Sequence, residues 1–181
     1  MKSPFLPLLF FLFLFSTSAS AQVVINEIMF HPAHAEDVAE PKGDEYIELL
    51  NTGPDPVSLL GWQFDRGVSF TFGNVLLQPG AFIVVAADVP AFQAAHPGVS
   101  NVVGGWAGQL SNSGESIRLI DGESGTVDSV SYADQGDWAQ RVRESSNGED
   151  GWTWNSQADG SGSSLELRNP ALSNNSGQNW S

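Results

Sequence analysis

Apolar positions fall in short runs that Gly, Pro, Asn and Asp residues separate. The run at 68–72 alternates with a period of two, which is typical of a strand with one buried face. The run at 82–86 is apolar throughout, which favours a strand that is covered on both faces. We expect strands at 23–30, 45–51, 57–64, 68–72, 82–86, 116–120 and 126–132, and one short helix at 90–96. Many short strands with turn residues between them predict an all-β sandwich or barrel.

The first 21 residues have the pattern of a secretory signal peptide. Lys2 precedes an apolar run at 4–15, which is shorter than the ~20 residues that a membrane-spanning helix needs. Small residues follow, and Ala19-Ser20-Ala21 fits the cleavage pattern, which argues against an uncleaved anchor. We expect a mature protein of residues 22–181 without a transmembrane segment, either secreted, periplasmic or on the cell surface.

Two polar regions interrupt the strand pattern. Residues 31–44 form an acidic insertion between the first two expected strands. Residues 133–181 are rich in Gly, Ser and Trp, and in them we expect a single β-like run, at 164–168, that returns to the sheet. The last residues have the composition of a linker, so we expect the chain to be a fragment of a larger protein.

Composition excludes several classes of function. The 181 residues include no cysteine, which rules out a disulfide scaffold, a thiol nucleophile and cysteine-bound metals. Seven Lys and Arg face 21 Asp and Glu, for a net charge of −14, so we expect no nucleic-acid partner. An exported chain without cysteine favours a bacterial source.

Several stretches occur in a characteristic order along residues 23–181. They are INEI at 25–28, FHP at 30–32, DEYIEL at 44–49, LGW at 60–62, LQPG at 77–80, LSNSGE at 110–115, ADGSGSSLEL at 158–167 and the closing Asn179-Trp180. Together they resemble the lamin-tail domain in its exported bacterial version. The resemblance implies an immunoglobulin-like β-sandwich without catalytic residues of its own. It also gives Trp62 a place in the sandwich core and Gly80 a turn position with a positive φ.

Three glutamates are the strongest metal candidates. Glu27 and Glu48 sit in the middle of expected strands with apolar residues on both sides, and a buried carboxylate must be paired, protonated or bound to a cation. Pairing with Arg66 or Arg118 is the simpler expectation. A calcium ion bridging Glu27, Glu45 and Glu48 is the alternative, since hard cations favour clustered carboxylates.

Two further groups of residues could bind ligands. Trp152 and Trp154 would share one face of a strand and could stack on sugar rings, although capping an edge of the sandwich is the simpler role. His31 and His34, beside the acidic insertion, could bind zinc or another divalent metal, although a solvated acidic loop is the simpler explanation.

The leading hypothesis is therefore a non-catalytic adhesion, targeting or assembly module of an exported bacterial protein, with a protein or cell-surface glycan as partner. The alternative is a carbohydrate-binding module, with calcium as a candidate cofactor.

Overall fold

The structure is a computed structural model that describes residues 22–34, 42–146 and 149–181. The expected signal peptide and residues 35–41 of the expected insertion lie outside the described residues.

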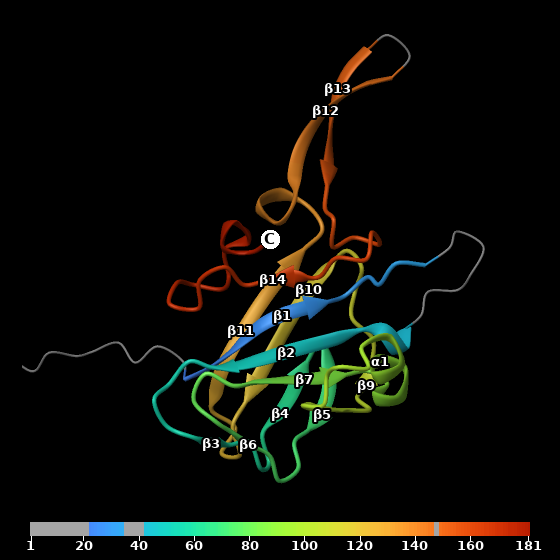
Figure 1. The fold of residues 1–181 in the computed structure, drawn as a ribbon. Helices are drawn as coiled ribbons and strands as arrows, with labels where there is room; N and C mark the ends of the chain where they lie inside the picture. The colour runs from blue at the N-terminus through green and yellow to red at the C-terminus, as the bar shows by residue number, and fades with distance from the viewer. Residues whose placement is uncertain (1–21, 35–41, 147–148) are drawn as a thin grey trace, which may run out of the picture.

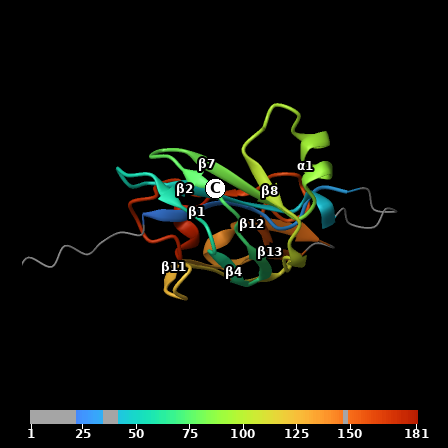
Figure 2. The ribbon, with the colours of Figure 1, turned by 90° about the horizontal axis from the view of Figure 1, so that it is seen from below.

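Two five-stranded sheets pack face to face, as the views in Figures 1 and 2 show. The first sheet has the order β14 (Leu165–Glu166), β1 (Val23–Met29), β2 (Tyr46–Asn51), β7 (Phe82–Ala86) and β8 (Val102–Gly104). The second has the order β11 (Thr126–Ala133), β10 (Gly114–Ile120), β4 (Gln63–Arg66), β5 (Val68–Thr71) and β9 (Ala107–Gly108). Among these ladders, β7 and β8 run parallel and the others are antiparallel.

Alternation along the strands fills the space between the sheets with large apolar side chains. Fully buried members of this core include Ile25, Ile28, Ile47 and Leu49 from the first sheet and Phe64, Ile117 and Leu119 from the second. The two-sheet arrangement confirms the predicted all-β sandwich, and the expected strands at 23–30, 45–51, 68–72, 82–86, 116–120 and 126–132 are present. The run at 57–64 divides into β3 (Val57–Ser58), which pairs with β6 (Leu76–Leu77), and β4.

The helix α1 (Val89–Ala95) confirms the single expected helix and covers part of the outer face of the first sheet. Asp88 caps its first turn by accepting a hydrogen bond from the Ala91 N–H at 3.0 Å. Phe92 then packs on Tyr46, with ring centroids 5.3 Å apart, so this apolar part of the outer face is buried as well.

The C-terminal segment returns to the sandwich and covers the edge of β1 that faces away from β2. In β14, Leu165 and Glu166 pair with Ile28 and Glu27. The Leu167 N–H donates to the Asn26 carbonyl at 2.8 Å. Trp180 then packs into the main core, so this segment is part of the sandwich.

Asp128 of β11 completes the same edge from the opposite sheet. Its carboxylate accepts the Ile25 N–H at 2.7 Å and the Asn174 side-chain amide at 2.7 Å. Burial raises the pKa of Asp128, while these hydrogen bonds favour its charged form. One carboxylate thereby joins the two sheets and the C-terminal segment.

The expectation of a single β-like run after residue 133 is wrong. A hairpin of β12 (Gln140–Ser146) and β13 (Glu149–Asn155) rises from the sandwich after the 3-10 helix η2 (Gly136–Trp138) and projects away from both sheets (Figure 1). Because the hairpin covers no core, its two strands carry few apolar residues, so the hydrophobic pattern alone gives only a weak strand signal there. The Asn-Gly dipeptide at 147–148 of the sequence, between the alternating Arg141-Val142-Arg143 and Trp152-Thr153-Trp154, is the signal that predicts it.

Candidate functional site

Three carboxylates form a row across the outer face of the first sheet. In the strand register, Glu27 lies directly opposite Glu48 on one side and Glu166 on the other. Asn26 lies where the register of β1 shifts between Ile25 and Glu27, and its side-chain amide donates a hydrogen bond to Glu48 at 3.0 Å. Like charges that face each other across a ladder destabilise a sheet.

Hydroxyl groups stabilise the central carboxylate of this row. The Tyr46 hydroxyl and the Ser164 hydroxyl each donate to Glu27 Oε1 at 2.5 Å. Tyr46 comes from β2 and Ser164 from the segment that leads into β14, so Glu27 connects three neighbouring strands.

Glu48 relieves the repulsion by holding its proton. Burial raises its pKa to about 7, and the charges of Glu27 and Glu166 act in the same direction, against the hydrogen bond from Asn26. Near neutral pH, this side chain therefore alternates between a neutral and a charged form.

Glu45 is separated from this row because it lies on the opposite side of the β2 backbone. It is fully buried, and its Oε2 accepts the Leu110 N–H at 3.0 Å. The DEYIEL and LSNSGE stretches thus contact each other directly. Glu45 holds the loop before β10, while Glu27 and Glu48 face outward.

The expected arginine partners lie elsewhere. Arg118 donates to both carboxylate oxygens of Asp65 within the second sheet, at 2.8 and 2.5 Å. This hydrogen-bonded pair lowers the pKa of Asp65. Arg66 sits opposite Arg118 in the same sheet, so the expectation that one of them neutralises Glu27 or Glu48 is wrong.

Within residues 22–34, 42–146 and 149–181, no three His, Asp or Glu side chains form a group that could hold a metal ion. The structure brings Glu27 and Glu48 together and keeps Glu45 apart from them. Calcium binding stays a prediction, now centred on the Glu27–Glu48 pair.

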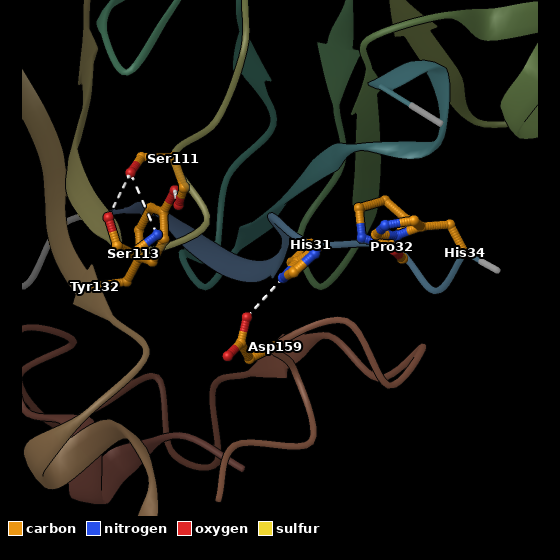
Figure 3. Close-up of polar contacts among 7 residues, drawn as sticks. All are labelled: His31, Pro32, His34, Ser111, Ser113, Tyr132 and Asp159. Carbon is orange, nitrogen blue, oxygen red and sulfur yellow. Dashed lines mark hydrogen bonds and ion pairs between the residues drawn. The ribbon is translucent and has the colours of Figure 1, made fainter. Parts of the chain in front are cut away.

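His31 and His34 lie at the end of β1, with ring centroids 5.6 Å apart (Figure 3). His31 Nδ1 contacts Asp159 Oδ1 at 2.6 Å, and the His31 carbonyl accepts the Gly160 N–H at 3.1 Å. Gly160 has a φ of +74°, and a Cβ there would lie 3.1 Å from the His31 ring. His31 therefore joins β1 to the C-terminal segment.

Trp152 and Trp154 share one face of the hairpin. Arg143 and Arg141 lie opposite them in the register and therefore occupy the same face. The Arg141 guanidinium lies 4.7 Å from the centre of the Trp152 ring, and Arg143 is paired with Asp150. The two indoles are 61% and 43% exposed, so they cap no edge of the sandwich. The sequence reasoning missed these arginines because it assigned no strand to them.

Two residues with expected structural roles lie in the sandwich itself. Trp62 precedes β4 and packs half-buried against the main core. Gly80 has a φ of +69°, and its N–H donates to the Asn51 carbonyl at 2.8 Å. The Asn51 side-chain amide donates in turn to the Leu77 carbonyl at 3.0 Å, which ties the LQPG turn to the end of β2.

The family model of the Lamin Tail Domain matches residues 16–134, about two thirds of the chain. The chain therefore belongs to the lamin tail domain family, a family of non-enzymatic, immunoglobulin-like domains. A search of curated proteins found no match. In the described part of the chain, no helix is long and apolar enough to cross a membrane. The match ends before the hairpin and the returning segment, so both lie outside the matched range.

The pKa of Glu48 predicts how stability depends on pH. Because the folded state holds this proton up to about pH 7 and an unfolded glutamate loses it near 4.5, the stability contributed by Glu48 falls as the pH rises between these values. The Glu48→Gln variant keeps an acceptor for Asn26 and removes the charge. We expect its Tm to match wild type at pH 4.5 and to exceed it by about 2–4 °C at pH 8, allowing for the screening of a half-exposed group.

Thermal melts of both proteins across this pH range measure the difference. Glu123→Gln, in an exposed turn of the second sheet, is the matched control and should follow wild type throughout. Parallel curves for wild type and Glu48→Gln would contradict the assignment.

Proposed function

We propose that this chain is a non-catalytic adhesion, targeting or assembly module of an exported bacterial protein, and that it forms part of a larger protein. Its lamin tail domain fold supports an interaction role with a protein or cell-surface partner. The signal-like N-terminus supports export.

The observation that carries this proposal is the hairpin β12–β13. It extends beyond the sandwich and exposes two tryptophans, although burying an aromatic side chain of this size favours folding strongly. Large aromatic side chains are enriched at protein interfaces, where a partner covers them.

The absence of catalysis is tested with the purified mature chain, residues 22–181. We expect no turnover on panels of ester, glycoside, phosphate and peptide substrates. Turnover that a single Asp, Glu or His substitution abolishes would overturn the proposal.

Carbohydrate binding is the second candidate, and the shared, exposed face of Trp152 and Trp154 favours it. Sugar rings present C–H groups to the faces of aromatic rings. Alternate residues of a strand lie roughly 6.6–6.8 Å apart, so an extended glycan chain could contact both indole rings.

Removing these indoles should weaken retention on a polysaccharide. Each aromatic contact is worth about 0.5–1.5 kcal/mol, so the double variant Trp152→Ala, Trp154→Ala should bind about 5- to 150-fold more weakly. Affinity electrophoresis in gels that contain soluble polysaccharides measures the effect. Leu60→Ala is the matched control, because Leu60 is 62% exposed on the sandwich itself. Equal retention of both variants would remove this candidate.

Calcium is the proposed cofactor at Glu27 and Glu48. A bound cation would offset their repulsion and stabilise the fold by RT ln(1 + [L]/Kd), about 2.7 kcal/mol at a hundredfold excess over Kd. Melts at pH 8 with calcium and with chelator, at matched ionic strength, test this. Superimposable melts would contradict it, as would a calcium shift that persists in Glu27→Gln and Glu48→Gln.

A further inference from the structure

An open cavity of about 650 Å³ lies between the C-terminal segment and the first sheet. Tyr46 lines it from β2, Trp138 from η2, and Gln140 and Asn155 from the base of the hairpin. Gln157 follows on the next loop. A cavity of this size accommodates a small molecule or a few linked sugar rings.

One wall of the cavity is aromatic and fixed in place. Trp138 packs against Trp180, with ring centroids 5.7 Å apart and ring planes tilted by 37°. Trp180 is 3% exposed, and its indole N–H donates to the Asn174 carbonyl at 2.8 Å, so its position is set by the core. Trp138 is half-buried and presents an apolar surface to the cavity.

Polar carboxamide groups lie at the rim of the cavity, in contrast to its aromatic wall. Gln140, Asn155 and Gln157 are exposed and make no side-chain hydrogen bond within the residues that the structure describes. Asn51 and Asn174, by contrast, use their carboxamides to hold other segments. A carboxamide both donates and accepts, which suits the hydroxyl groups of a sugar.

Charge narrows the class of ligand further. Glu166 and Asp137 line the cavity together with Arg168. The whole chain carries a net charge of −14, which disfavours an anionic polymer. An aromatic wall backed by the core, carboxamides without side-chain partners among the described residues, and acidic residues in the lining together fit a neutral, hydroxyl-rich ligand.

We propose that this cavity binds a neutral sugar residue of a glycan, an inference that rests on the carbohydrate-binding function proposed above. Gln140 and Asn155 pair across the hairpin, and Trp154 belongs to the next pair, whose side chains point to the other face of the ribbon. The cavity and the indole face are therefore separate surfaces, and variants can distinguish them.

Isothermal titration of residues 22–181 with cellohexaose, xylohexaose, mannohexaose and hexagalacturonate tests the proposal. We expect a neutral hexasaccharide to bind, and the double variant Gln140→Ala, Asn155→Ala to bind it about tenfold more weakly, the loss expected for two hydrogen bonds. The double variant Gln63→Ala, Asn74→Ala changes the same residue types at exposed positions outside the cavity lining, and it should bind like wild type.

Four other outcomes would each contradict a different part of this proposal. If Trp152→Ala and Trp154→Ala weaken sugar binding and the cavity variant does not, the carbohydrate-binding function stands, but the cavity is not the binding site. Binding of no sugar removes both. Equal or tighter binding of hexagalacturonate overturns the neutral class. A dimer in sedimentation that the cavity variant dissociates would make the cavity an interface between copies.

Discussion

The open edge of β1 is the constraint on which the rest of this structure depends. A buried strand must satisfy its backbone groups on both sides, and β2 satisfies one side of β1. The other side is completed piecewise, by the Asp128 carboxylate at Ile25, by β14 at Glu27 and Ile28, and by Gly160 at His31. Most of these partners come from the C-terminal segment, beyond the range that matches the lamin tail domain.

This return of the chain positions the features that distinguish the module. The path from β11 back to β1 leaves the sandwich at η2, forms the hairpin and comes back past Asp159, so the cavity arises where its two ends meet the first sheet. The return also places Glu166 beside Glu27, on the side opposite Glu48. The resulting repulsion is relieved by hydroxyl donors to Glu27 and by the raised pKa of Glu48.

The sequence pattern predicted the strands whose side chains form the hydrophobic core. The strand around Ile117 alternates buried with more exposed residues because one of its faces packs on the core, and the strand around Ile25 is apolar at most positions because both of its faces are buried. The pairing of Glu27 with Glu48 follows from adjacent strands. The hairpin escaped prediction because both its faces are polar or exposed. The partners of Arg118 and Glu45 escaped because hydrogen bonds between distant segments leave no periodic signal.

Thermal melting of a chain of residues 22–134 tests most directly whether the C-terminal segment is a necessary part of the sandwich. A chain in which an Asn-Gly turn replaces residues 141–154 serves as the control, since it keeps β14 and Trp180 while losing the hairpin. The account predicts that the control melts cooperatively within a few degrees of wild type, and that the chain of residues 22–134 shows no cooperative transition. A cooperative melt of residues 22–134 near the wild-type Tm would contradict it.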